Sequence, residues 1–267
     1  MPLTPQLIAA YEEALYALDA GPVLRIGEEN AELEGLLAAR GAAGAAFITA
    51  ANPRGEPRSH AENEAAMTQL RNALDWPWLE GEGRDPLGRW PAERSLLVLG
   101  IGRQEAEALG RRLAQNAIVF VERGGAPELV LLRPMRLVID TQLWLDWLVF
   151  DDASMAPLRA ALACGRAEAV IDEPCRAELE RVLAYPLNRP VDAASCMQRC
   201  LEVARKVEAA PAEPLPVCRD PDDQKFLELA AGAGADCLVS RDRELLRLDR
   251  RCAPRFRVLP PQAFARR

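Results

Sequence analysis

The sequence of 267 residues has very little histidine and lysine, with a single histidine, His60, and two lysines, Lys206 and Lys225. One histidine excludes zinc sites built from several histidines and metalloproteases with an HExxH helix. It also leaves a Ser-His-Asp triad only one candidate base. Any catalysis is therefore expected to depend mainly on carboxylates.

Long apolar runs and a basic N-terminus are also missing. No stretch approaches the roughly 18 uncharged apolar residues of a membrane helix, and the best runs, Ser95–Gly102 and Leu113–Val121, have the length of strands. Glu12 precedes any arginine or lysine, so the chain does not begin like a signal peptide. With 49% hydrophobic and 27% charged residues, whole-chain disorder is excluded. We therefore expect a globular, cytoplasmic protein with no membrane partner.

The seven cysteines are an odd number, all lie in the second half of the chain, and none forms a CxxC motif. This pattern argues against a disulfide framework and favours reduced thiols in the core. Cys196 and Cys200 are four residues apart and would share a helix face. We interpret them as packing residues, with a metal or redox pair as the alternative.

The length predicts between one and two domains, and the pattern changes near Arg133-Pro134-Met135-Arg136. Residues 1–133 are predicted to form an α+β accessory domain, with a helix over Pro5–Asp19 and a loop over Trp76–Glu93. Residues 134–267 alternate strands and helices, including a helix over Ala193–Val207. This alternation predicts an α/β, three-layer domain with a parallel sheet.

Acidic residues of the second half fall at the ends of predicted elements. Asp140 ends an apolar strand, Asp242 follows the strand Cys237–Ser240, and Glu178 lies in a helix, while three more acids precede a helix: Asp220, Asp222 and Asp223. In an open parallel sheet, ligands bind beyond the carboxyl ends of the strands. Converging carboxylates are tolerated when a divalent cation neutralises them, and oxygen ligands suit Mg²⁺ or Mn²⁺. The alternative is that these residues are turn formers and helix caps.

Four segments of the second half together resemble the PIN-domain family, over about residues 136–264. They are Val138-Ile139-Asp140-Thr141, the helix segment Glu178-Leu179-Glu180-Arg181-Val182-Leu183, the run Cys218-Arg219-Asp220-Pro221-Asp222-Asp223-Gln224-Lys225-Phe226-Leu227, and Leu238-Val239-Ser240-Arg241-Asp242. The resemblance implies a Rossmann-like sheet and a Mg²⁺- or Mn²⁺-dependent endoribonuclease.

Carried over by motif, the acidic site is Asp140, Glu178, Asp223 and Asp242. Asp220 and Asp222 compete with Asp223 as the third metal ligand. Hydroxyl and amide groups around the ligands would come from Thr141, Gln142 and Ser240. Gln142 stands where the family commonly has asparagine, so it keeps the amide but reaches further.

The branch of the family that this chain is most similar to consists of toxin components of toxin–antitoxin systems. The resemblance therefore implies RNA as the substrate, with an antitoxin protein and a second copy of the chain as further partner candidates. The alternative function is a non-catalytic PIN-like protein that binds RNA or protein and is regulated by its N-terminal domain. Binding of a divalent cation separates these two hypotheses.

The first half resembles domain of unknown function family 3293 over about residues 7–132. The likeness is carried by segments that include Phe47-Ile48-Thr49-Ala50, Glu62-Asn63-Glu64 and Gln115-Asn116-Ala117-Ile118-Val119. It implies no activity. Five polar residues would either line a ligand pocket or serve as turn, cap and buried hydrogen-bonding groups: Asn52, Glu62, Asn63, Gln115 and Asn116.

Three weaker patterns are interpreted structurally. Gly100-Ile101-Gly102 lacks the third glycine of a dinucleotide-binding loop and is expected to be an ordinary turn. Trp144 and Trp147 are expected to pack in the core rather than stack on bases. The arginines between Arg241 and Arg257 would either follow a phosphate backbone or form a solvated helix face.

Overall fold

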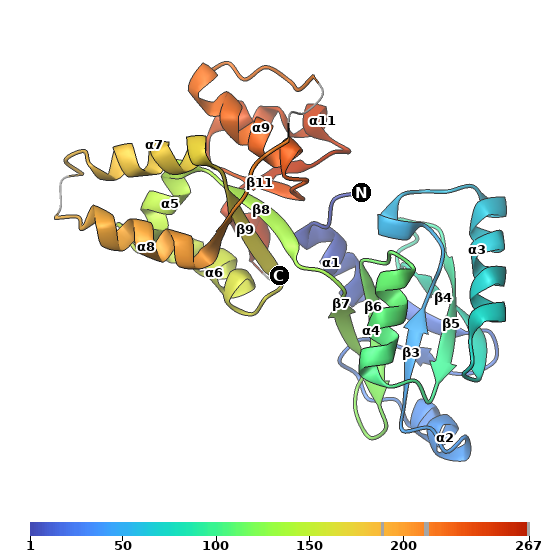
Figure 1. Ribbon diagram of the computed structural model, residues 1–267. Coiled ribbons are helices and arrows are strands. Elements are labelled where there is room, and N and C mark those ends of the chain that lie inside the picture. The colour runs from blue at the N-terminus through green and yellow to red at the C-terminus, as the bar shows by residue number, and fades with distance from the viewer. Residues whose placement is uncertain (188–189, 211–213, 266–267) are drawn as a thin grey trace. The chain divides into compact units, whose positions relative to one another are not determined.

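The computed structural model describes residues 1–187, 190–210 and 214–265, and it divides the chain into two compact units (Figure 1). One unit is Gln6–Arg133, and the other combines Pro134–Arg267 with Met1–Pro5. The change of unit after Arg133 falls where the sequence pattern changes, but the first five residues lie with the second unit. No helix among the described residues is both long enough and apolar enough to cross a membrane.

The unit of residues 6–133 is built on a seven-stranded antiparallel sheet with the strand order β2-β1-β4-β5-β3-β6-β7. Its strands are β1 (Leu15–Leu18), β2 (Val23–Leu24), β3 (Gly44–Ile48), β4 (Trp78–Arg84), β5 (Glu93–Leu99), β6 (Ala117–Glu122) and β7 (Glu128–Leu131). The central strands β3, β5 and β6 are almost entirely buried because both faces of the sheet are covered.

Four helices accompany this sheet, namely α1 (Pro5–Glu13), α2 (Ala31–Ala39), α3 (His60–Ala73) and α4 (Arg103–Arg112). Met67 of α3 and Leu109 of α4 pack with Val98 on one face, whereas Leu33 and Leu37 of α2 pack with Phe47 on the other. Alternate residues of each central strand therefore enter two separate cores. This confirms an α+β class for the first half.

Two predicted elements of the first half are wrong. The helix predicted over Pro5–Asp19 ends at Glu13, because Leu15–Leu18 instead pairs with β4. The predicted loop over Trp76–Glu93 contains β4, despite its two glycines. Gly81 is required there, since a Cβ at this position would lie 2.5 Å from the Ala17 carbonyl oxygen and 2.7 Å from Phe47.

The second unit contains a five-stranded sheet in which every pair of neighbouring strands is parallel. Its order is β10-β9-β8-β11-β12, with β8 (Met135–Ile139), β9 (Ala167–Ile171), β10 (Ala204–Lys206), β11 (Cys237–Val239) and β12 (Arg257–Leu259). The chain runs outward from β8 to β10 and then returns to place β11 on the other side of β8. This arrangement confirms the Rossmann-like prediction and makes the boundary between β8 and β11 the topological switch point.

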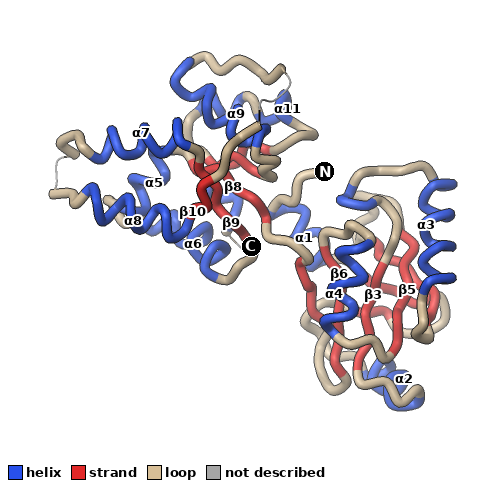
Figure 2. Tube along the Cα trace, viewed as in Figure 1, coloured by secondary structure: helices blue, strands red, loops and turns tan. Residues whose placement is uncertain are grey.

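Helices lie on both sides of this parallel sheet, as Figure 2 shows. One group consists of α5 (Thr141–Leu148), α6 (Ala156–Ala163), α7 (Glu173–Leu183) and α8 (Ala193–Val203), and the other of α9 (Gln224–Gly232), α10 (Arg243–Arg247) and α11 (Asp249–Cys252). The helix predicted over Ala193–Val207 is too long. Its last residues form the edge strand β10, because Ala204–Lys206 pairs with β9.

Two predictions about packing residues agree with the structure. Trp144 and Trp147 are buried and stack with a centroid distance of 5.3 Å. Six of the seven cysteines are buried, Cys164 being the exposed one, and no disulfide joins them in the described residues. Burial raises the pKa of Cys200 to about 12, which keeps this thiol protonated and unreactive at neutral pH.

The segment Met1–Pro5 is fixed to the second unit by burial and hydrogen bonding. Leu3 is fully buried, and its backbone N–H donates to Asp236 Oδ1 at 2.7 Å. The other oxygen of Asp236 accepts from the backbone N–H of Arg136 at 2.9 Å. Asp236 thus joins the start of the chain to the start of β8.

Replacing Leu3 by alanine should destabilise the unit that contains residues 134–267, by about 3 kcal/mol, because it opens a cavity in that core. The matched variant Leu24→Ala removes an equally buried leucine from the other unit. Chemical unfolding followed with probes for each unit should show the two losses in different transitions. Identical effects of both variants on one transition would show that the two units share a core.

Candidate active site

The centre of the candidate site is a hydrogen-bonded link between the ends of two neighbouring strands. Asp140 follows β8 and begins α5, where its Oδ1 accepts from the backbone N–H of Gln142 at 2.8 Å. Ser240 follows β11, and its hydroxyl donates to Asp140 Oδ2. Both residues are buried, Ser240 completely. The structure therefore places the Ser240 hydroxyl beside the Asp140 carboxylate.

Ser240 also positions the second acid of this edge. Its oxygen accepts from the backbone N–H of Asp242 at 2.9 Å. Asp242 then begins α10, and its Oδ1 accepts from the N–H groups of Glu244 at 2.7 Å and Leu245 at 3.0 Å. One serine hydroxyl therefore connects the carboxylate after β8 with the backbone of the acid after β11.

Asp223 and Glu178 interact with Asp140 through their charges, and we call these residues together with Asp242 the acidic cluster. Burial raises the pKa of Asp223 to about 6, and the charges of Asp140 and Asp242 contribute to this rise. Burial also raises the pKa of Asp140; hydrogen bonds from Ser240 and Gln142 oppose the rise, and the charges of Asp242 and Glu178 add to it. The charges of Asp242 and Glu178 thus act on Asp140, and the charges of Asp140 and Asp242 act on Asp223.

Lys225 is a cation that the sequence prediction did not assign to the site. It lies in the first turn of α9, and its Nζ is 2.5 Å from Glu178 Oε2 of α7. Glu178 Oε2 is buried and forms no hydrogen bond among the described residues, so this contact is an ion pair without hydrogen-bond geometry. The clue in the sequence is the position of Lys225, two residues after Asp223.

The two competing candidates for the third ligand are placed differently from Asp223. Asp220 begins the short helix Pro221–Asp223, and its Oδ1 accepts from the N–H of Asp222 at 2.9 Å. Asp220 and Asp222 are both exposed, whereas Asp223 is half-buried. The charge of Asp220 raises the pKa of Asp223, but the contributions of Asp140 and Asp242 come first. Its partly buried position near Asp140 and Asp242 makes Asp223 a better candidate for the third metal ligand than Asp220 or Asp222.

The predicted amide and hydroxyl neighbours differ in their contacts. The backbone N–H of Gln142 contacts Asp140, but its side-chain Nε2 donates to Asp146 Oδ1 at 3.1 Å. Thr141 is buried at the first position of α5. The longer reach of Gln142, compared with the asparagine common in the family, directs its amide along α5 rather than to Asp140.

Arg241 lies between Ser240 and Asp242, and the sequence pattern predicted no role for it in the acidic site. Its guanidinium pairs with Asp146 and with Asp152, at 3.1 Å from Asp152 Oδ2, and it donates to the Ser154 hydroxyl. These contacts fix the loop between Ser240 and Asp242 to the end of α5. Arg247 and Arg257 also pair with acidic side chains, Glu244 and Asp249, but 68% of the Arg247 side chain is exposed, so both interpretations of the arginine segment stay predictions.

The polar residues singled out in the first half mostly form turns and caps. The Asn63 amide donates to Asn52 Oδ1 at 3.0 Å, and the Asn52 amide donates to Glu93 Oε2 at 2.7 Å. Glu62 completes a capping box with Ser59, and Gln115 Nε2 donates to the Ala51 carbonyl at 2.9 Å. Asn116 differs from them, because both polar atoms of its buried side chain lack hydrogen-bond partners among the described residues.

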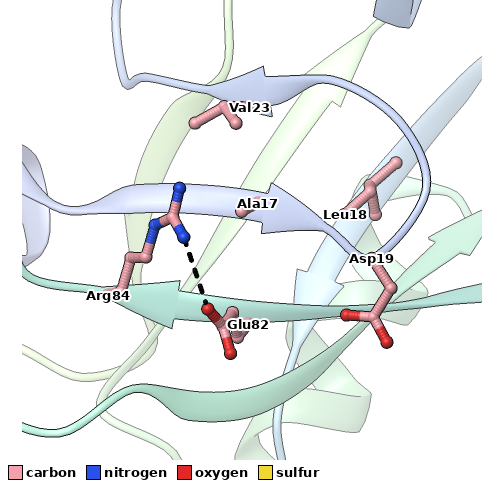
Figure 3. A pocket seen from close by; sticks show the side chains of 6 residues that line it. All are labelled: Ala17, Leu18, Asp19, Val23, Glu82 and Arg84. Carbon is pink, nitrogen blue, oxygen red and sulfur yellow. Dashed lines mark ion pairs between the residues drawn. The ribbon is translucent and has the colours of Figure 1, made fainter.

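An open pocket of this unit lies elsewhere, between β1, the residue that begins β2 and the end of β4 (Figure 3). Asp19, Glu82 and Arg84 are among its lining residues, and Arg84 lies 3.6 Å from Glu82. None of the five polar residues predicted as pocket candidates lines it. The turn-and-cap interpretation therefore fits Asn52, Glu62, Asn63 and Gln115.

Comparison with protein families agrees with this division. Residues 136–244 match the family model of the PIN domain. This match covers both strands of the switch point and all the predicted acids, and PIN domains are in general nucleases that use divalent metal ions. Residues 48–118 match a protein of unknown function family, DUF3293. Both predicted resemblances are confirmed over shorter stretches than expected, and no curated protein matches the chain.

The donor set of the PIN domain suits a hard divalent cation. Its four carboxylates provide only oxygen atoms, the ligands that Mg²⁺ and Mn²⁺ prefer, and Glu178 Oε2 is a buried acceptor without a hydrogen bond. Within residues 1–187, 190–210 and 214–265, no three acidic, cysteine or histidine side chains form a ready-made metal-ligand group. Ser240 and backbone N–H groups hold Asp140 and Asp242, and Lys225 pairs with Glu178.

Replacing Ser240 by alanine should lower the affinity of the protein for Mn²⁺ by about 10- to 100-fold, because Asp140 and the backbone of Asp242 lose their common partner. Ser195→Ala is the control, since Ser195 is an exposed residue of α8. Isothermal titration calorimetry with Mn²⁺ measures both variants. Equal affinity of Ser240→Ala and the wild type would contradict a role of this hydroxyl in arranging the acids.

The raised pKa of Asp223 predicts a stability that depends on pH. The folded state holds this proton more tightly than the unfolded chain, so in metal-free buffer stability should fall as the pH rises from about 4 to above 6. Asp223→Asn removes this titration and should be more stable than the wild type at pH 7.5 by about 1 kcal/mol, after allowance for solvent screening.

This difference should vanish at about pH 3 and below, where the Asp223 carboxyl is mostly protonated in both the folded and the unfolded state. Asp222→Asn removes a charge from the exposed neighbouring position and controls for net charge. Urea unfolding at several pH values is the measurement. A similar gain for both variants would show that net charge, rather than the cluster around Asp223, causes the effect.

Proposed function

We propose that the PIN domain of this protein is a metal-dependent endoribonuclease, and that Asp140, Glu178, Asp223 and Asp242 are its metal-binding and catalytic acids. The observation that carries this proposal is the Ser240 link between Asp140 and Asp242 at the switch point of the parallel sheet. Asp223 and Glu178 act on the same cluster through their charges. A shared divalent cation would offset the mutual repulsion of the carboxylates at this edge of the sheet.

The residues of the chain divide the work of hydrolysis. A bound Mg²⁺ or Mn²⁺ would lower the pKa of a water molecule and offset the charge of the phosphate. Ser240 and the N–H groups of Gln142, Glu244 and Leu245 keep Asp140 and Asp242 oriented. The other two acids come from separate helices, so the cation would be held from several directions. Attack of water on the phosphodiester would leave a 5′-phosphate, as the resemblance implies.

The test of this function is the variant Asp140→Asn. It removes a charged ligand without changing the volume of the side chain, so the fold should persist while the rate of RNA cleavage falls by at least about 100-fold. Asp151→Asn is the matched control, because the Asp151 side chain is 83% exposed and, within the described part of the chain, pairs with Arg159. Cleavage of a labelled single-stranded RNA with Mn²⁺, and with EDTA, is the measurement.

Cleavage by Asp140→Asn at the wild-type rate, insensitive to EDTA, would disprove the mechanism. The outcome that supports the alternative function is RNA binding without cleavage by the wild type and without uptake of Mn²⁺. In that case the chain would be a non-catalytic PIN-like binding protein.

The toxin role remains part of the proposal, together with action in the cytoplasm and an antitoxin or second-copy partner. The resemblance of the acidic segments to the toxin branch supports it. The wild type and Asp140→Asn together test the toxin role. Induced expression of the wild type should arrest growth of the host cell, whereas expression of Asp140→Asn should not. An antitoxin, if it acts on this site, should restore growth when co-expressed.

A further inference from the structure

Lys225 is one of only two lysines in the chain, and it lies inside the acidic cluster of the PIN domain. The other, Lys206, lies on the edge strand β10 and pairs with Glu173 at 2.8 Å, with both side chains more than half exposed. The two lysines therefore make ion pairs of different kinds. Lys225 and Glu178 have side-chain exposures of 21% and 19%, so solvent screens their pair less.

The Lys225 ammonium contacts the Glu178 oxygen that would bind a divalent cation. It is 2.5 Å from Glu178 Oε2, which is buried and accepts no hydrogen bond among the described residues. The charge of Lys225 also lowers the pKa of Asp223, so its field reaches a second acid of the cluster. A divalent cation bound by Glu178 and Asp223 would meet a positive charge at this point.

Release of this ammonium from Glu178 would not leave it without partners. Lys225 Nζ also donates to the Asp222 carbonyl oxygen, and it lies 5.1 Å from the centre of the Phe226 ring. Its side chain is still partly open to water. An ammonium with these contacts and a flexible four-carbon stem can exchange one partner for another at small cost.

We propose that Lys225 is a built-in competitor of the divalent cation, holding Glu178 as an internal counter-charge until the cation displaces it. The proposal rests on the metal-dependent function proposed above. The ammonium neutralises part of the repulsion among the carboxylates while the cluster contains no divalent cation. The protein therefore gains stability in that state and binds the cation more weakly, so Lys225 sets the concentration at which the site fills.

The test is the affinity of the full-length protein for Mn²⁺, measured by calorimetry and by the free-ion electron paramagnetic resonance signal. Lys225→Met keeps the apolar stem and removes the charge, and it should bind Mn²⁺ about five- to tenfold more tightly than the wild type. Lys225→Arg keeps the charge and should stay within about twofold of the wild type. Lys206→Met removes the same charge outside the cluster and should leave the affinity unchanged.

Unchanged or weaker Mn²⁺ binding by Lys225→Met would overturn the proposal. An equal gain in Lys206→Met would also overturn it, because net charge rather than competition for Glu178 would then explain the effect. If the wild type and every variant bind no Mn²⁺, the proposed metal-dependent function itself fails. Mn²⁺-dependent cleavage of RNA by the wild type, together with unchanged affinity in Lys225→Met, removes the competitor role alone.

A second measurement does not depend on how the variants fold. Reductive methylation with ¹³C-formaldehyde keeps the positive charge and labels the two lysines and the terminal amine of the wild-type protein. Addition of Mg²⁺ should shift the Lys225 signal as it leaves Glu178, while the Lys206 signal should stay in place. A Lys225 signal that does not respond to saturating Mg²⁺ would show that the ion pair persists and would contradict the exchange.

Discussion

The constraint on which the site depends is the mutual repulsion of carboxylates that the parallel sheet brings to one edge. β8 and β11 are neighbours and run in the same direction, so the residues after them lie side by side. Two acids at such a point would separate if nothing held them. The Ser240 hydroxyl prevents this, because it donates to Asp140 and accepts from the backbone of Asp242. Burial raises the pKa of both Asp140 and Asp223, and the charges of neighbouring carboxylates add to both rises.

The acids at this edge are held in two different ways. Several contacts of Arg241 fix the loop that carries Asp242, whereas one lysine pairs with Glu178. Arg241 joins the loop after β11 to Asp146, Asp152 and Ser154, so the backbone that carries Asp242 is fixed to the end of α5. Glu178, in contrast, comes from α7 and is held by the single flexible side chain of Lys225. A site with two fixed acids and one that can change partners is suited to bind a cation by replacing an internal charge.

The unit of residues 6–133 follows a different design, since its sheet is antiparallel and buried on both faces. At Gly81, β1 and Phe47 leave no room for a side chain. The polar residues at the ends of its strands mainly satisfy one another and the backbone, which explains why a polar pattern in the sequence did not correspond to a pocket. Asn116 is the exception, as a buried amide whose polar atoms have no hydrogen-bond partner among the described residues.

The sequence by itself determined the parallel α/β class of the second half and the strand ends that carry Asp140 and Asp242. These features depend on local apolar runs and on the rule that parallel strands place their carboxyl ends at one edge. Only the tertiary structure shows that Leu15–Leu18, Trp78–Arg84 and Ala204–Lys206 are strands. Leu15–Leu18 pairs with Trp78–Arg84, and Ala204–Lys206 pairs with β9, so these partners are distant in sequence. The tertiary structure also decided that Lys225 faces Glu178 and that Arg241 faces Asp146. An ion pair between two elements depends on how those elements pack, and residue spacing along the chain contains no record of that distance.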